Sequence, residues 1–231
     1  MPPDVGVIVV AAGRGARVGG LPKQFRELAG IPVLLRSLRP FTSHPDVACT
    51  VVALPAESVA APPEWLAPLA GERLRLVAGG AERGDSVRAG LSALPPACSI
   101  VLVHDAARPL VSTETIAAVI ALARQGVGAV AAVPLGDTLK VVSDDPANGS
   151  VERTIPRAGL WRAQTPQGFP RALLERAAAA ALADGVQGTD DAELVERIGG
   201  AVRVVPDRVS NLKLTTSDDF ALAAALLQEP R

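Results

Sequence analysis

The residues best suited to chemistry form a loop after the first apolar run, residues 11–24, which read AAGRGARVGGLPKQ. Gly13 and Gly15 let the backbone turn tightly, so that its N–H groups can approach an anion without a Cβ in the way. Two cations, Arg17 and Lys23, flank the glycines. Together they suit a triphosphate carrying about four negative charges, although a solvated turn with incidental charges remains the alternative.

Two familiar glycine motifs do not fit this loop. A dinucleotide-binding fingerprint needs a third glycine where Val18 stands. A P-loop needs Gly-Lys-Ser/Thr, but Gly20 is followed by Leu21. The loop is therefore interpreted as a phosphate-binding loop of another kind.

A second group of polar residues follows later apolar runs. Asp105 lies at the carboxyl end of one such run, where open α/β sheets bind ligands, and a carboxylate facing phosphates is a natural Mg²⁺ ligand. Arg108 is placed to contact a substrate phosphate, and the alternative is a helix-start Asp beside a surface Arg. Gly80, Arg83 and Ser86 begin an expected helix whose N-terminus attracts anions, unless Ser86 merely caps it.

Lysine is rare in this chain, which has twenty arginines and only Lys23, Lys140 and Lys213. A lysine is a compact, mobile point charge that suits a phosphate moving through a transition state. Lys213 is therefore a candidate beside Lys23. The two histidines match no catalytic pattern, so we interpret His104 as structural and His44 as a loop residue.

Six apolar runs must position these side chains, at residues 6–12, 47–54, 74–78, 99–103, 127–133 and 201–205. Continuous β-branched runs are typical of strands buried on both faces. Helix-like patterns lie between several of them, with Ser112, Asp190 and Ser217 as expected caps. We expect one α/β domain over residues 1–231, a Rossmann-like, mostly parallel twisted sheet flanked by helices.

One segment breaks the alternation of strands and helices. Residues 137–155 read as two short strands around a Pro/Asn-Gly turn, which predicts a hairpin. An isolated hairpin is marginal in water and must pack on something. Residues 137–157 are therefore interpreted as a β-arm that either pairs two subunits or forms an edge hairpin of its own sheet.

Composition excludes several classes of protein. Of the 231 residues, 48% are hydrophobic and 20% charged, enough to build a core and too many apolar residues for a disordered chain. The net charge of −1 gives no general field for nucleic acid, and no run approaches the ~20 apolar residues of a membrane span. Neither an export signal nor a cysteine framework is evident, so a cytoplasmic location is expected.

Five motifs in order resemble one family along residues 6–226. They are residues 11–24, residues 79–87 (GGAERGDSV), 103–109 (VHDAARP), 164–167 (QTPQ) and 211–215 (NLKLT). The chain resembles the 2-C-methyl-D-erythritol 4-phosphate cytidylyltransferases of the non-mevalonate isoprenoid pathway. Ala81 stands where some relatives have an acidic residue, which leaves the contacts to the base open.

The resemblance implies two substrate sites. The CTP site contains Ala11, Ala12, Gly13, Gly15, Gly80, Arg83 and Ser86. The methylerythritol phosphate site contains Asp105, Arg108, Thr138, Arg157, Thr165 and Thr189. By default the three threonines are satisfied turn or cap residues. In the family the counterpart of Arg157 reaches across a homodimer into the neighbouring site.

The expected reaction is attack by the acceptor phosphate on the α-phosphorus of CTP, which releases pyrophosphate. The second pKa of a phosphate monoester is near 6, so the acceptor is already a dianion and needs no general base. Arg17, Lys23 and Lys213, helped by loop amides and Mg²⁺, are expected to stabilise charge at the α-phosphate.

Three other functions remain open at this stage. The nearest alternative is a cytidylyltransferase for ribitol 5-phosphate or another polyol phosphate. The others are a sugar-1-phosphate nucleotidyltransferase that uses UTP or GTP and a nucleotide-binding regulatory module.

Overall fold

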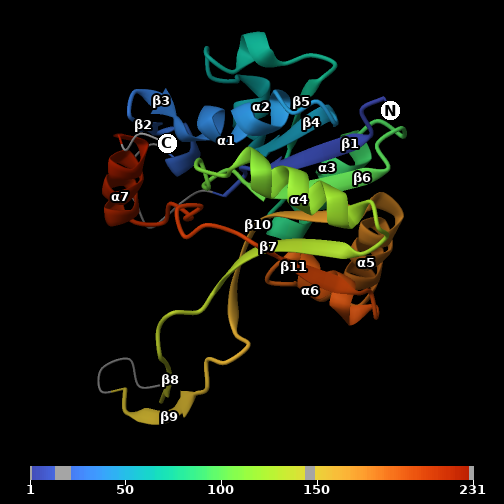
Figure 1. Ribbon diagram of the computed structural model, residues 1–231. Helices are drawn as coiled ribbons and strands as arrows, with labels where there is room; N and C mark the ends of the chain where they lie inside the picture. The colour runs from blue at the N-terminus through green and yellow to red at the C-terminus, as the bar shows by residue number, and fades with distance from the viewer. Residues whose placement is uncertain (1, 14–21, 144–148, 229–231) are drawn as a thin grey trace.

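A computed structural model describes residues 2–13, 22–143 and 149–228 (Figure 1). Its centre is a seven-stranded sheet in the order β11-β7-β10-β6-β1-β4-β5. The strands are β1 (Val5–Val10), β4 (Val47–Leu54), β5 (Leu74–Ala78), β6 (Ile100–Asp105), β7 (Gly128–Pro134), β10 (Trp161–Pro170) and β11 (Val202–Pro206). Neighbouring strands are parallel except for β10, which is antiparallel to β6 and to β7. The predicted α/β fold with a mostly parallel sheet is confirmed.

Helices cover both faces of the sheet because the strands are apolar on both faces. On one face, α1 (Val33–Thr42) and α4 (Thr113–Ala123) pack on Val7 and Val9 of β1. On the other face, α3 (Arg83–Ala93), α5 (Arg171–Ala183) and α6 (Asp191–Arg197) surround Ile8. Two clusters of buried side chains, one on each face, thus hold the strand ends in place.

The expected helix caps are partly correct. Ser112 accepts the N–H of Thr115 at the start of α4, and Asp190 accepts the N–H of Glu193 at the start of α6. Ser217, however, is the first residue of α7 (Ser217–Gln228), where Thr216 Oγ1 accepts the N–H of Asp219 instead. A hydroxyl one residue earlier has the position that a cap requires.

Smaller elements complete the body around the sheet. They are a 3₁₀ turn η2 (Lys23–Phe25), a short ribbon of β2 (Glu27–Leu28) and β3 (Ile31–Pro32), helix α2 (Ala56–Ala60) and a second 3₁₀ turn η3 (Ala67–Leu69). Along the described parts of the chain, no helix is long and apolar enough to cross a membrane.

The predicted hairpin is confirmed and projects from the body (Figure 1). It consists of β8 (Leu139–Val142) and β9 (Val151–Ile155), paired antiparallel with Leu139 opposite Ile155. These strands form a two-stranded sheet of their own, separate from the seven-stranded sheet. The pairing of two subunits through this arm stays a prediction.

Candidate functional site

A cleft of about 760 Å³ lies at the carboxyl ends of β1, β4, β5 and β6, four adjacent parallel strands. Open α/β sheets bind ligands at this edge, where connections leave in opposite directions. Nine of the predicted site residues line the cleft: Ala11, Ala12, Gly13, Lys23, Gly80, Arg83, Ser86, Asp105 and Lys213. The fold thus brings together four chain regions that are far apart in the sequence: the first glycine motif, the turn before α3, the end of β6 and the segment around Lys213.

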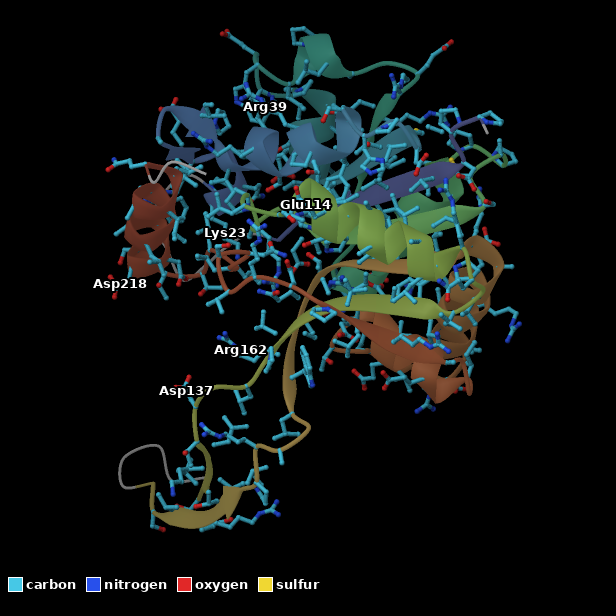
Figure 2. The ribbon with its side chains drawn as sticks, viewed as in Figure 1. Lys23, Arg39, Glu114, Asp137, Arg162 and Asp218 are labelled. Carbon is cyan, nitrogen blue, oxygen red and sulfur yellow. The ribbon has the colours of Figure 1, made fainter. Side chains whose placement is uncertain are left out.

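The first wall of the cleft is the loop after β1. Gln24, which is 2% exposed, donates from Nε2 to the carbonyl of Ala11 at 2.8 Å and to that of Gly13 at 3.3 Å. This buried amide holds residues 11–13 after β1, and its neighbour Lys23 lines the cleft (Figure 2). Sequence reasoning assigned no role to Gln24. Gly15 and Arg17 lie outside the described residues.

The second wall is the turn between β5 and α3, where glycine is needed for close packing. A Cβ on Gly79 would stand 2.4 Å from Cβ of Ala12, and a Cβ on Gly80 would stand 2.1 Å from Cβ of Asp85. Side chains at either position would therefore displace their neighbours.

The start of α3 is already capped by the protein itself. Glu82 and Asp85 form a reciprocal capping box, so their carboxylates satisfy amides that we expected to be open to an anion. Ser86 is not the cap; it lies 3% exposed in the first turn and lines the cleft.

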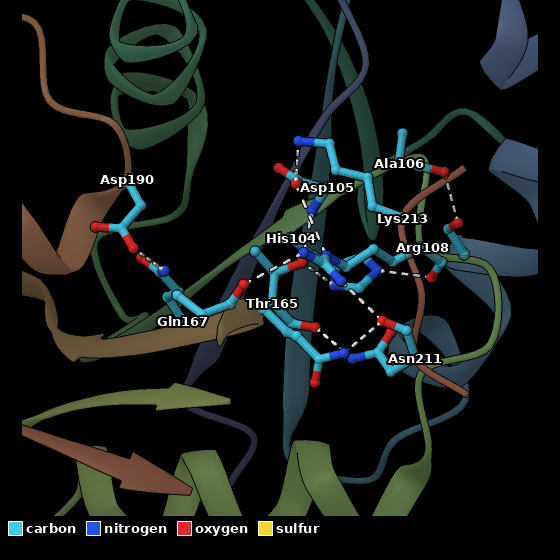
Figure 3. A network of polar contacts seen from close by, with 12 residues as sticks. His104, Asp105, Ala106, Arg108, Thr165, Gln167, Asp190, Asn211 and Lys213 are labelled. Carbon is cyan, nitrogen blue, oxygen red and sulfur yellow. Dashed lines mark hydrogen bonds and ion pairs between the residues drawn. The ribbon is translucent and has the colours of Figure 1, made fainter. Parts of the chain in front are cut away.

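Three cations surround Asp105, and two of them, Lys213 and Arg108, are labelled in Figure 3. Its carboxylate lies 2.8 Å from Nζ of Lys213, 3.6 Å from Nε of Arg83 and 3.9 Å from Nε of Arg108. Burial alone raises the pKa of the Asp105 carboxyl, but Lys213 and Arg83 more than offset burial and lower it to about 2. Asp105 is therefore ionised throughout the neutral range.

Arg83 links Asp105 to a second buried carboxylate. Its Nη2 atom lies 2.7 Å from Oδ2 of Asp191, the first residue of α6, whose side chain is 2% exposed. Gln167 holds the start of this helix, because its Oε1 accepts the N–H groups of Asp191 and Ala192. Sequence reasoning missed Asp191 and gave Gln167 no role, since no local pattern shows that Asp191 pairs with Arg83 or that Gln167 holds the start of α6.

Two of the predicted site residues, Arg108 and Thr165, lie behind the cleft lining and contact Asp105. The Thr165 hydroxyl accepts the N–H of Asp105 at 3.0 Å and lies 3.0 Å from Nδ1 of His104. Nε2 of His104 lies 3.1 Å from the carbonyl of Arg108, which can only accept, so the ring is assigned its proton on Nε2. Burial lowers the pKa of His104 to about 4, which keeps the ring neutral at physiological pH.

The remaining predicted residues lie away from the cleft lining. Thr189 is exposed before α6, where its N–H and hydroxyl both donate to Glu193. The Glu193 carboxylate therefore accepts from Thr189, one residue before the cap Asp190. Thr138, just before β8, and Arg157, just after β9, are both exposed. Arg157 hydrogen-bonds the carbonyl of Gly136.

The donor set fits a metal ion that takes most of its ligands from a substrate. Within the described residues no group of three His, Cys, Asp or Glu side chains could hold a metal alone. Oδ1 of Asp105 lies 3.6 Å from Nε of Arg83, whereas Oδ2 is held more closely by Lys213, at 2.8 Å. Mg²⁺ is often bound by one or two carboxylates together with substrate phosphates.

Comparisons with known proteins agree with this arrangement. Residues 5–229 match the family model described as IspD: 2-C-methyl-D-erythritol 4-phosphate cytidylyltransferase. A relative of that name from Symbiobacterium thermophilum is 47% identical over 97% of this chain and 93% of its own, and one from Streptomyces coelicolor is 44% identical over 100% and 87%. The crystal structure of the enzyme from Thermus thermophilus superposes with a TM-score of 0.80 at 35% identity, covering 98% of this chain and 100% of that one.

Proposed function

The chain belongs to the 2-C-methyl-D-erythritol 4-phosphate cytidylyltransferase family and is a CTP-dependent nucleotidyltransferase, and on this premise we propose roles for its residues. The reaction converts CTP and 2-C-methyl-D-erythritol 4-phosphate to 4-diphosphocytidyl-2-C-methyl-D-erythritol and pyrophosphate. An acceptor phosphate oxygen attacks the α-phosphorus, and the bond from that phosphorus to the β-phosphate oxygen breaks. The acceptor is a dianion at neutral pH, so the task of the protein is to stabilise charge rather than to remove a proton.

CTP binds across the two glycine walls. Ala11, Ala12, Gly13 and Gly15 follow β1, and Gly80, Arg83 and Ser86 follow β5. The lack of a side chain at Gly79 supports this role, because it lets the turn after β5 pack directly against Ala12 of the turn after β1. Arg83 is held in place by Asp191, so its orientation is set before the nucleotide binds.

Arg17, Lys23 and Lys213 stabilise the charge that grows at the α-phosphate. The observation that carries this assignment is that Lys23 and Lys213 line one cleft although they come from opposite ends of the chain. Cations fixed in advance cost no reorganisation at the moment of reaction, which makes them effective in lowering the barrier.

The acceptor site begins at Asp105 and Arg108. Arg108 and Thr165 form its inner wall, and Thr189 lies on the loop before α6. Thr138 and Arg157 belong to the arm and serve the site of a partner subunit. Their exposure, and their place outside the cleft lining, supports a role across an interface.

Members of this family use a divalent metal ion, and Mg²⁺ is the ion that suits these donors. Asp105 would hold it together with the phosphates. When bound, the ion neutralises charge on the phosphate oxygens.

The chain works as one domain over residues 1–231 and forms a homodimer through the arm. Several apolar side chains of the hairpin are exposed, with Val142 at 52% and Val151 at 57%, and a second copy would cover them. Small molecules are the substrates, and neither nucleic acid nor a membrane is a partner. The location is cytoplasmic.

A pyrophosphate-release assay tests the function. CTP, Mg²⁺ and 2-C-methyl-D-erythritol 4-phosphate should give the fastest release. UTP in place of CTP, and ribitol 5-phosphate in place of the acceptor, serve as controls. Equal or faster release with ribitol 5-phosphate would overturn the acceptor assignment.

A further inference from the structure

The segment that carries Lys213 has no regular secondary structure over residues 207–216, so side-chain contacts must fix the lysine. On one side, Leu214 is fully buried and its N–H donates to the carbonyl of Ala107 at 2.8 Å. On the other side, Asn211 is 1% exposed. Lys213 is thus bracketed by two buried neighbours.

Asn211 is the more heavily bonded of the two. Its Nδ2 donates to the Thr165 carbonyl at 2.8 Å and to Oδ2 of Asp207 at 2.6 Å, and both partners only accept, which fixes the orientation of the amide. Its own backbone carbonyl accepts from Nη1 of Arg108 at 2.7 Å and from Nε2 of Gln164 at 2.9 Å. One residue therefore joins β10, Arg108 and the Lys213 segment (Figure 3).

These contacts reach Asp105 by two routes. The peptide of Thr165 holds Asn211, and the hydroxyl of Thr165 holds the N–H of Asp105. Along the chain, Lys213 is two residues from Asn211, a reach of about 7 Å at most. A shift of Asn211 must therefore move Lys213, Arg108 or both relative to the carboxylate.

We propose that Asn211 is a positioning residue that sets Lys213 and Arg108 against Asp105 for transfer to the acceptor phosphate. Asn211 lies outside the cleft lining, so it acts through the two cations. This inference rests on the proposed function, because the roles of both cations come from it.

The test is Asn211→Ala, with kinetics for the acceptor and direct calorimetric titration of CTP. The substitution leaves the Thr165 carbonyl and Asp207 without their donor, and the segment shifts. Misplacement of a catalytic group by about 1 Å lowers the rate on the order of 10²-fold, so kcat/KM for the acceptor should fall about 30- to 100-fold. The Kd for CTP should stay within about threefold, because the hydrogen-bond partners of Asn211 lie away from the nucleotide walls and Lys213 acts on charge that grows only in the transition state.

Arg171→Ala is the matched control. Arg171 also clamps backbone, since its guanidinium donates to the carbonyls of Pro95 and Leu91. Arg171 lies at the amino end of β6, the end of the strand away from the cleft, where its N–H donates to the carbonyl of Ser99. This variant should lose thermal stability while kcat and KM per folded molecule stay within about threefold.

The stoichiometry of CTP binding counts folded sites and separates misfolding from misplacement. If Asn211→Ala gives no soluble protein, Asn211→Ser, which keeps one donor, should show the same pattern at smaller amplitude. The inference is overturned if acceptor kinetics per CTP-binding site stay within threefold of the wild type, or if CTP affinity falls in the same proportion. Failure of the proposed function would appear earlier, as a wild-type enzyme that does not use the acceptor.

Discussion

The ammonium nitrogen of Lys213 lies 2.8 Å from Oδ2 of Asp105, and this ion pair joins the segment before α7 to the carboxyl end of β6. The lysine side chain remains 42% exposed, whereas that of the aspartate is 11% exposed. One charge is thus fixed inside the protein, and its partner faces the cleft. A cation in this position is steadied by the protein and still open to an incoming phosphate.

Removing either lysine of the cleft should slow the chemical step. Lys213→Ala and Lys23→Ala should each lower kcat about 10²- to 10³-fold, as loss of one preorganised donor does in other enzymes. Arg39→Ala is the control, because Arg39 is an exposed cation on α1 outside the cleft (Figure 2). Pyrophosphate release with saturating CTP measures the effect. A change below about threefold in both lysine variants would contradict their assignment.

Asp105→Asn should alter the dependence on metal. An amide cannot supply the anionic oxygen that Mg²⁺ prefers, so the Mg²⁺ concentration for half-maximal activity should rise at least about tenfold. Chelation of the metal should stop turnover in the wild type. The same substitution at Asp137, exposed on the arm, should leave the metal requirement unchanged. An unchanged requirement in Asp105→Asn would show that this carboxylate does not hold the ion.

The buried histidine makes stability depend on pH. In the unfolded chain His104 takes up a proton near pH 6.5, but burial lowers its pKa to about 4 in the folded protein. The unfolded state therefore binds more protons between these values. The free energy of unfolding should be undiminished above pH 6.5 and should fall as the pH drops from 6.5 to 4, by up to about 3 kcal/mol.

Urea unfolding at pH 7, 6 and 5 measures this fall, and His104→Gln supplies the comparison. Burial raises the pKa of Asp191, which works in the opposite direction, so the difference between the two proteins carries the test. The variant should be less stable than the wild type at pH 7 and should lose less on acidification. Equal losses in both proteins would exclude His104 as the source.

Local patterns were sufficient to predict the strands that end at the cleft, because each is a mostly apolar run, interrupted only at single positions such as Arg75 of β5. They did not predict β10, whose residues WRAQTPQGFP include two prolines and two glutamines. Those glutamines are buried, and distant partners hydrogen-bond their amides. Gln164 hydrogen-bonds the carbonyl of Asn211, and Gln167 hydrogen-bonds the start of α6. Contacts of this kind depend on tertiary packing and leave no period in the sequence.

The space beside Gly79 predicts an effect on nucleotide binding. In Gly79→Ala the new Cβ would stand 2.4 Å from Ala12 and 2.6 Å from Oγ of Ser86, and both neighbours line the cleft. Overpacking of this kind typically costs about 1–3 kcal/mol of folding stability and is relieved by shifts of the neighbours, so the displaced walls should raise the Kd for CTP about tenfold. Gly71→Ala is the control, because no described atom lies within 4 Å of its Cβ position. Equal CTP affinity in the two variants would contradict the prediction.

Mixed dimers test whether Arg157 serves the partner subunit. Arg157→Ala and Lys213→Ala should each be nearly inactive alone. In a heterodimer, the subunit that keeps Lys213 would receive an intact arm from its partner, so one of two sites should work. Heterodimers purified through two different affinity tags should therefore show about half the wild-type rate. If the arm serves its own subunit, neither site is complete and the heterodimer stays inactive.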